Sequence, residues 1–154
     1  MPQDKTTHNT THEATIEWTR ASADFQYKTY NRGHLWRFAD GQEVRASAAP
    51  AYLGDPGCVD PEEAMVAALS SCHMLTFLAI AAKRKLVVDR YTDRAAGILE
   101  NNAAGKLAIT RVTLRPEIAF SGPAPTADEL AAMHREAHEH CFIANSVRTE
   151  ITIE

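Results

Sequence analysis

Short segments in which apolar and polar residues alternate occupy the first third of the chain, ahead of any long apolar run. Alternation with a period of two is typical of half-buried strands, and turn residues at 31–33 and 40–41 separate the segments. We therefore expect a meander of strands at 14–18, 25–30, 34–38 and 43–48. The next segment, 49–59, holds two prolines and two glycines and is expected to form an irregular loop.

A helix is predicted to begin directly after this loop. Asp60 can accept hydrogen bonds from the first free backbone N–H groups, and Pro61 has the φ angle that a first helical turn requires. Glu62 and Glu63 place negative charge at the positive end of the helix dipole. The apolar run that follows carries the predicted helix to about Arg84.

This predicted helix has no polar face. Between residues 64 and 82 the residues other than apolar ones are Ser70, Ser71, Cys72, His73 and Thr76. A helix that is apolar all round is expected to be buried on every side. A membrane span is the alternative, since the run approaches about 20 residues. The polar groups at its centre, its many alanines and the lack of a second such segment favour a buried central helix.

The second half of the chain returns to strand patterns, at 86–88, 91–99 and 108–120, with a hairpin turn at 101–105. Thr126 and Glu129 have the spacing of a capping box, which predicts a second helix from 127 to about 140. Residues 147–154 alternate again and are expected to form the last strand. This order predicts an α+β fold, with antiparallel strands around the buried central helix and a second helix beside it.

The chain is expected to form a single domain over 14–154, preceded by a disordered lead-in at 1–13. Its 154 residues suffice for one core. They are few, however, to surround an apolar helix completely. We therefore expect a homodimer in which two chains share a core.

Charge and composition exclude several classes of function. The formal net charge is −4 and the longest basic run is Lys83-Arg84-Lys85, so the basic face of a nucleic-acid-binding protein is missing. The first residues lack the apolar stretch of a signal peptide, so we expect a cytoplasmic protein that does not bind membranes. The sequence has no nucleotide or flavin fingerprint, and we expect no cofactor.

The three cysteines are the main candidates for chemistry. An odd number in a chain without an export signal does not form a disulfide framework, which leaves buried packing, metal binding or redox chemistry. Cys72 lies in the run Ser70-Ser71-Cys72-His73, inside an otherwise apolar helix. Buried polar groups need partners, so this run indicates the wall of a pocket. Cys141 follows the second helix directly.

These residue types suit a thiol peroxidase. Such an enzyme needs a thiolate, a cation that keeps the thiolate ionised, a carboxylate that holds the cation, and a second thiol. The thiolate attacks the peroxide O–O bond and becomes a sulfenic acid, and the second thiol condenses with it before over-oxidation. Glu62, in the first turn of the cysteine helix, is placed to orient an arginine. Composition and spacing do not select which arginine that is.

Two motifs resemble those of the OsmC/Ohr family (osmotically inducible protein C and organic hydroperoxide resistance proteins). The stretch 60–72, which begins Asp60-Pro61-Glu62 and ends Ser70-Ser71-Cys72, resembles the family's cysteine helix, where the glutamate of a Pro-Glu pair precedes the reactive cysteine by ten residues. The stretch 137–146 resembles the family's second cysteine segment. The order of strands and helices also agrees, so the resemblance covers about 14–154.

The resemblance implies an intertwined homodimer of OsmC-like fold that reduces organic hydroperoxides to alcohols in an antioxidant stress response. It implies that Cys72 is the peroxidatic sulfur and Cys141 the resolving one, joined during turnover by a Cys72–Cys141 disulfide. A dithiol reductant, such as a lipoyl-type group, would then restore the two thiols. The active sites would lie at the interface between the two subunits.

The resemblance also selects an arginine. In one branch of the family the arginine lies between the first two strands, eight residues before an Asp-Gly turn. Arg32 has this spacing from the turn at 40–41, so the resemblance implies that Arg32 holds the thiolate ionised. Arg37 is the second choice.

Two other functions stay open. A zinc site would draw on the nitrogen and sulfur ligands Cys72, His73, His138, His140 and Cys141. Adjacent helical residues point about 100° apart, however, and no Cys-x-x-Cys pair is present, so no metal is expected. The other alternative is a non-catalytic dimer whose apolar pocket binds a small ligand. Cys58 is expected to be an incidental thiol, and His73 either lines the site or is a core histidine.

Overall fold

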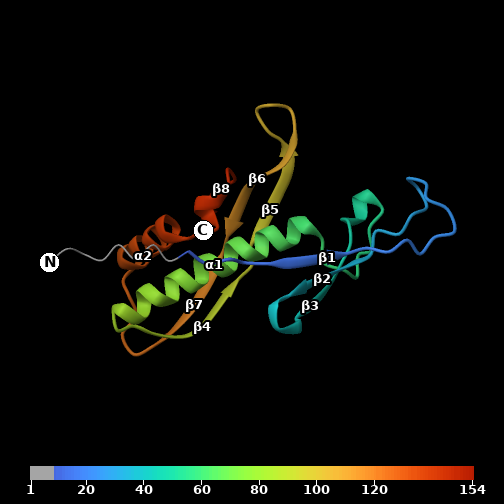
Figure 1. Ribbon diagram of the computed structural model, residues 1–154. Coiled ribbons are helices and arrows are strands. Elements are labelled where there is room, and N and C mark those ends of the chain that lie inside the picture. Colours follow the sequence, from blue (N-terminus) through green and yellow to red (C-terminus); the bar gives the residue numbers. More distant parts are fainter. Residues whose placement is uncertain (1–8) are drawn as a thin grey trace. The chain divides into compact units, whose positions relative to one another are not determined.

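The structure is a computed structural model that describes residues 9–154 (Figure 1). The chain divides into two compact units, one that ends at Pro61 and one that runs from Glu62 to Glu154. Most of the lead-in that the sequence predicts to be disordered lies outside the described residues, and 9–13 form neither helix nor strand. The single-domain organisation of 14–154 stays a prediction.

The first unit contains a three-stranded antiparallel sheet in the order β1-β2-β3. Its strands are β1 (Ala14–Glu17), β2 (His34–Phe38) and β3 (Glu43–Ala46). Trp36 of β2 lies opposite Ile16 of β1 and Val44 of β3, so the three side chains form a row across the sheet. The structure confirms all three predicted strands, although the first and third end earlier than expected.

The predicted strand at 25–30 is wrong. The backbone N–H groups of Thr29 and Tyr30 both donate to the carbonyl of Gln26, which closes a turn instead of a ladder. The aromatic side chains here pack on one another: the rings of Phe25 and Tyr30 are 5.2 Å apart and those of Phe25 and Trp18 are 5.9 Å apart. The segment 25–30 is therefore a turn with an aromatic cluster and not a strand.

The loop after β3 is irregular, as expected, with one short 3-10 helix at Pro50–Tyr52. It is also tight, because the N–H of Gly54 donates to the carbonyl of Ala49 over 3.2 Å. A Cβ at position 54 would stand 1.5 Å from the carbonyl oxygen of Ala48, so only glycine fits there. Asp60 is buried at the end of this loop, where the long helix begins.

The second unit is built on α1 (Pro61–Lys83), whose bounds agree with the sequence prediction to within a residue. Burial on every side, which its composition predicted, is found on one face only. The buried residues of the helix are Leu69, His73, Phe77, Ile80 and Ala81, whereas Leu75 is 61% exposed. By length and composition α1 could span a membrane, with 28% of its most apolar window buried. Two sheets and α2 cover one side of α1.

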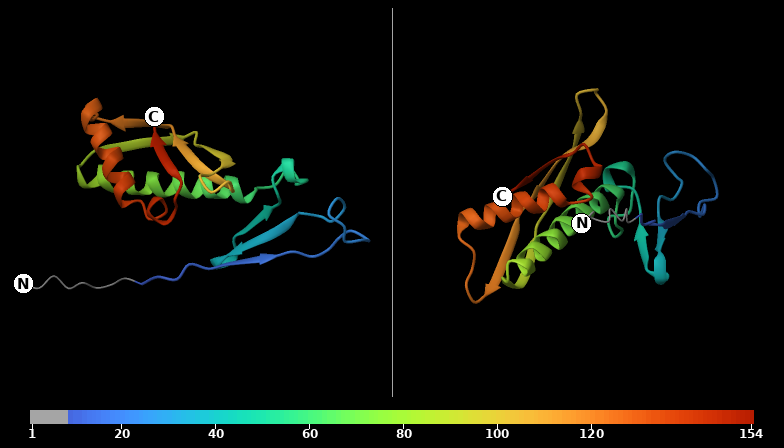
Figure 2. Two further views of the ribbon diagram at one scale, coloured as in Figure 1. Left: turned by 90° about the horizontal axis from the view of Figure 1, so that it is seen from above. Right: turned by 60° about the vertical axis from the view of Figure 1, so that its left-hand side comes forward.

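The strands of the second unit form two sheets (Figure 2). One pairs β4 (Val87–Asp93) with β7 (Pro116–Ser121), and the other has the order β5 (Ala96–Asn101), β6 (Leu107–Leu114), β8 (Glu150–Ile153). Two predicted long strands are therefore each divided, because the chain passes from one sheet to the other. At that crossing the N–H of Arg115 donates to the carboxylate of Asp93 over 2.6 Å.

One pair of strands departs from the expected antiparallel arrangement. β6 and β8 are parallel, with Val112 opposite Ile151. Parallel neighbours need a long crossover connection. Here β7, α2 (Ala127–His140) and the short 3-10 helix η3 (Ala144–Ser146) supply it.

The second helix agrees with its prediction at both ends. The N–H of Glu129 donates to Oγ1 of Thr126 over 3.2 Å, and the N–H of Thr126 donates to Oε2 of Glu129 over 2.8 Å. This capping box satisfies backbone groups that the first turn leaves free, so the start of α2 is determined locally.

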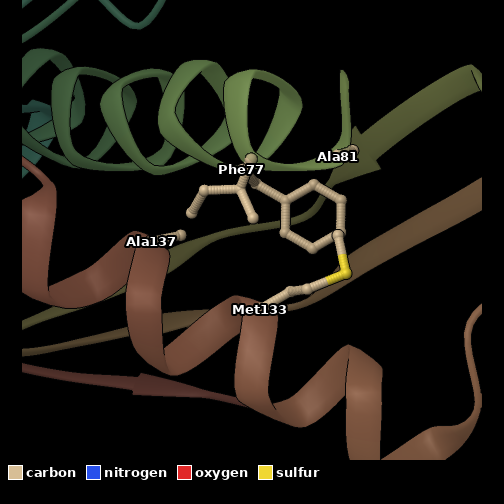
Figure 3. Packing of buried hydrophobic residues seen from close by; sticks show 5 residues of the cluster. Phe77, Ala81, Met133 and Ala137 are labelled. Carbon is tan, nitrogen blue, oxygen red and sulfur yellow. The ribbon is translucent and has the colours of Figure 1, made fainter. Parts of the chain in front are cut away.

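Two apolar clusters hold α1 in place. Figure 3 shows the first, in which the ring of Phe77 and Ala81 from α1 pack against Met133 and Ala137 from α2. The second cluster packs Leu69, nearer the start of α1, against Val112 and Leu114 of β6. The cysteine-bearing part of α1 lies between these two clusters and is fixed from both directions.

Candidate active site

Cys72 lies near the middle of α1, one position before the buried His73. It is a free thiol and is partly exposed. Its neighbour Thr76 donates its hydroxyl to the Cys72 carbonyl over 2.9 Å, so the helix stays regular through this polar stretch. The sulfur is therefore carried on a rigid helix and stays accessible from outside the unit.

Cys141 occupies a different environment at the end of α2. It is the C-terminal capping residue of that helix, and its own N–H donates to the carbonyl of His138. The side chain is 1% exposed, so solvent does not reach it. The backbone N–H of Ala144 points at its sulfur, with nitrogen and Sγ 3.4 Å apart. The chain turns through η3 directly afterwards and closes over this thiol.

The structure brings these two thiols together. Cys72 lies close enough to Cys141 to contribute to the shift in its pKa, although the two residues are far apart in sequence and belong to different helices. Burial raises the pKa of the Cys141 thiol, and the neighbouring Cys72 raises it further, against the opposing effect of the Ala144 N–H. Cys141 is thus held as a neutral thiol beside a more accessible sulfur.

A pair of buried histidines joins α1 to α2, the two helices that lead to the thiols. Nε2 of His73 and Nδ1 of His134 are 3.0 Å apart, which is a hydrogen bond between the two rings. Burial, together with the nearby His134 and His138, lowers the pKa of His73 to about 4. Burial also lowers the pKa of His134. Both rings are therefore uncharged at neutral pH. The sequence left open whether His73 lines the site or is a core histidine, and in the structure it is buried in the core.

Glu62 lies in the first turn of α1, as the sequence predicted, and one of its carboxylate oxygens has an unusual environment. Oε2 is buried and has no hydrogen-bond partner among the described residues. A buried carboxylate oxygen without a donor is costly in free energy. Ten residues of α-helix separate Glu62 from Cys72 by about 15 Å along the axis, so the carboxylate does not touch the thiol itself.

The two candidate arginines lie in the first unit. The guanidinium of Arg32 donates to the backbone carbonyls of Tyr27 and Tyr30 and lies 3.7 Å from the centre of the Tyr30 ring. Together with Trp18 and Phe25, Arg32 lines a cavity of about 470 Å³ within this unit. Arg37 instead forms ion pairs across the exposed surface of the sheet, 3.0 Å from Glu17 and 3.4 Å from Glu43. Arg32 is thus the one that lines a cavity.

The remaining candidates have other surroundings. The sulfur of Cys58 lies in the first unit, 3.9 Å from an Nη of Arg45 and 3.7 Å from the carboxylate of Asp55. His138 is half-buried, with Nδ1 unpartnered among the described residues, and His140 is exposed. Within residues 9–154, no three His, Cys, Asp or Glu side chains are grouped closely enough to hold a metal ion. The zinc alternative therefore has no ligand set in the part of the chain that is described.

His134 is the residue of this site that the sequence analysis missed. It is 9% exposed, and its ring stacks 4.6 Å from that of Phe77. A signal was present, because Leu130, Met133 and Ala137 form an apolar stripe on α2 in which His134 is included. A histidine in the buried stripe of an amphipathic helix needs a buried polar partner, and here that partner is His73.

Comparison with known proteins places this site in a family. The family model for OsmC-like proteins matches residues 54–154, which include both helices and both cysteines of the site. The chain belongs to the OsmC-like family. The family and the α+β fold that the two motifs implied are therefore confirmed. No curated protein that was compared matches this OsmC-like chain.

Solved structures agree with this assignment. The chain is 50% identical to an OsmC-like protein of unknown function from Vibrio cholerae, with a TM-score of 0.91 over 95% of this chain and 99% of the other. An organic hydroperoxide resistance protein from Elizabethkingia anophelis is 19% identical, with a TM-score of 0.72, over 96% of this chain and 94% of the other. One from Legionella pneumophila is 17% identical, with a TM-score of 0.70, over 94% of each chain. At such identities the last two comparisons show a common fold.

Proposed function

We propose that this OsmC-like protein is a thiol peroxidase that reduces organic hydroperoxides to alcohols, with Cys72 as the attacking sulfur and Cys141 as the resolving one. The observation that carries the proposal is the pair of interacting thiols, one partly exposed and one buried. The accessible thiol can meet a peroxide, whereas the buried one meets only its neighbour. Family membership and two structural relatives, both named as organic hydroperoxide resistance proteins, support the same chemistry.

The proposed reaction has two steps on the enzyme. The Cys72 thiolate attacks the terminal oxygen of the hydroperoxide, the O–O bond breaks, and the alkoxide leaves and takes up a proton as the alcohol. Cys72 is then a sulfenic acid. The sulfur of Cys141 attacks the Cys72 sulfur, the S–O bond breaks, and hydroxide leaves with the Cys141 proton as water. The product is the Cys72–Cys141 disulfide, and a dithiol reductant returns both cysteines to thiols.

Arg32 and Glu62 complete the proposal. The resemblance gives Arg32 the task of holding the Cys72 thiolate ionised, and the unpartnered oxygen of Glu62 suits the carboxylate that orients a guanidinium. The aromatic lining of the cavity beside Arg32 favours an apolar organic group on the peroxide. We propose a lipoyl-type dithiol as reductant, and a cytoplasmic protein in which thiols stay reduced between turnovers.

Mass spectrometry of peroxide-treated protein tests the proposed function. We expect one equivalent of cumene hydroperoxide to convert the reduced chain to a form two hydrogens lighter, with a single intrachain bond between Cys72 and Cys141. Thiols that survive excess peroxide unchanged would instead leave a ligand-binding role as the better explanation of the fold.

The same experiment separates the two arginines. Arg32→Ala is expected to slow the peroxide-dependent loss of the Cys72 thiol by about ten- to a hundredfold, because a thiol without a nearby cation is less ionised at neutral pH. Arg37→Ala is the matched control, since its ion pairs lie on an exposed sheet surface. Equal rates for the wild type and Arg32→Ala would remove Arg32 from the mechanism.

We further propose a homodimer that covers the free face of α1. Apolar side chains are exposed along this helix, with Leu75 61% accessible. A second copy of the chain would bury them. Light scattering is expected to give twice the mass of one chain, and Leu75→Glu is expected to give the mass of a single chain. Leu107→Glu, at a residue that is 59% exposed on β6, is the matched control. A wild type with the mass of one chain would refute the dimer.

A further inference from the structure

The two helices that carry the reacting sulfurs are joined by a pair of histidines. His73 follows Cys72 directly on α1, and His134 lies on α2 two turns before Cys141. Their ring nitrogens are 3.0 Å apart, and the ring planes are within 9° of parallel with centroids 5.3 Å apart. Exposure is 1% for His73 and 9% for His134, so water does not compete for this hydrogen bond.

The direction of this hydrogen bond follows from the unused nitrogen. Nδ1 of His73 is buried and has no partner among the described residues. A buried N–H without an acceptor is less tolerable than a buried lone pair without a donor, so the His73 proton belongs on Nε2. His73 therefore donates through Nε2, and Nδ1 of His134 accepts. One shared proton joins the two neutral rings.

His134 is also held from a second direction. Its ring stacks on that of Phe77, with centroids 4.6 Å apart, and Phe77 is itself fully buried in the cluster between α1 and α2. The His134 ring thus contacts two residues of α1, His73 by a hydrogen bond between nearly parallel rings and Phe77 by stacking. Because interiors are close-packed, α2 cannot slide along α1 without breaking this contact.

We propose that the His73–His134 hydrogen bond is a positioning device that aligns Cys141 with Cys72 for disulfide formation. The inference rests on the proposed function and deepens it. The first step needs only Cys72, a cation and the peroxide, so α2 does not take part in it. The second step needs a sulfur from each helix within bonding reach, and the histidine pair sets the offset of the two helices beside the sulfurs. Neither histidine touches the reacting atoms.

Two substitutions at position 73 separate alignment from packing. His73→Phe keeps an aromatic ring of similar size but removes the donor to His134. His73→Gln loses the ring but places an amide N–H close to the position of Nε2. If the alignment of the two sulfurs depends on the hydrogen bond, His73→Gln retains the alignment and His73→Phe loses it. This order is expected even if His73→Phe is the more stable of the two variants.

The experiment follows both steps in each variant. Dimedone traps the Cys72 sulfenic acid, and mass spectrometry gives its partition against the Cys72–Cys141 disulfide after one equivalent of cumene hydroperoxide. We expect His73→Phe to form the disulfide about tenfold more slowly, since small misplacements of reacting groups have effects of this size or larger. Loss of the Cys72 thiol should keep its wild-type rate. His73→Gln should form the disulfide within about threefold of the wild-type rate.

Disulfide formation with diamide gives a second readout that does not depend on peroxidase activity. Diamide takes one hydrogen from each of two thiols and becomes the hydrazine, so it reports on alignment alone. If the wild type does not react with peroxide, the proposed function is refuted. If diamide nevertheless forms the disulfide more slowly in His73→Phe than in His73→Gln and the wild type, the positioning role of the histidines still stands. A His73→Phe chain that closes the disulfide at the wild-type rate, or a His73→Gln chain as slow as His73→Phe, would overturn it. If His73→Phe does not fold, His134→Phe removes the same hydrogen bond from the other helix.

Discussion

Replacing Cys72 by serine is expected to abolish peroxide turnover, whereas replacing Cys141 by serine should leave one turnover per chain. A serine hydroxyl is not ionised at neutral pH and does not attack the O–O bond, so without Cys72 the reaction falls to the uncatalysed rate. Without Cys141 the first step proceeds and Cys72 becomes a sulfenic acid. No second thiol is then present to condense with it, and further peroxide converts it to the sulfinic and sulfonic acids.

Mass spectrometry and a burst experiment check this pair of variants. Cys141→Ser should release one equivalent of alcohol in the burst, and with further peroxide its Cys72 peptide should come to carry two or three oxygen atoms in all. Cys58→Ser is the matched control, because its sulfur lies in the first unit beside Arg45 and Asp55, and its turnover should equal that of the wild type. Similar residual turnover in Cys72→Ser and Cys141→Ser would show that the two roles are assigned wrongly.

Replacing Phe77 by alanine is expected to lower the free energy of unfolding by about 3–5 kcal/mol. Phe77 is fully buried and contacts Met133 of α2, and its ring lies 4.6 Å from that of His134 and 5.8 Å from that of Tyr91. Its removal leaves a cavity between α1, α2 and β4 that the surrounding elements cannot fill. Denaturant unfolding, followed by circular dichroism, measures the change.

Phe142→Ala is the matched control for this measurement. The same side chain is removed there, from a position that is 81% exposed in the same unit. A change within about 0.5 kcal/mol is expected, as for surface substitutions in general. An equal loss of stability in the two variants would mean that the cluster around Phe77 does not hold the helices together.

The elements that were predicted most closely are those whose signals are local. The start of α2 was predicted to the residue, because the capping box of Thr126 and Glu129 is made by four consecutive positions. The start of α1 was equally clear from the turn that contains Asp60 and Pro61. β2 was predicted in full because glycines and an Asp-Gly turn bound it on both sides.

The features that were missed depend on contacts between distant residues. The segment 25–30 has the composition of a strand, but whether it pairs depends on a neighbour that the structure does not supply. The parallel register of β6 and β8 is set by how α2 returns the chain, which no local pattern records. One face of α1 is exposed because the two sheets and α2 of the second unit cover only its other side, and the apolar pattern of the helix does not record how many elements pack against it.

The site shows the same division. The two cysteines were selected from their polar neighbours and from the motifs, and the structure brings their side chains together. His134 was not selected, because its importance comes from His73, sixty-one positions earlier. A single histidine on a helix is usually an ordinary core or surface residue. Only its hydrogen bond to a second histidine indicates a specific role. The roles of Cys72, Cys141, Arg32 and Glu62 stay predictions.

The placement of Cys141 at the end of α2 has a consequence for the resting protein in a cell that contains electrophiles. Carbonyl groups at the end of a helix carry partial negative charge, which adds to burial in disfavouring a thiolate there. A neutral, covered sulfur is a poor target for alkylating agents and stray disulfides. On the proposed mechanism, the chain therefore protects its resolving sulfur until Cys72 has been oxidised.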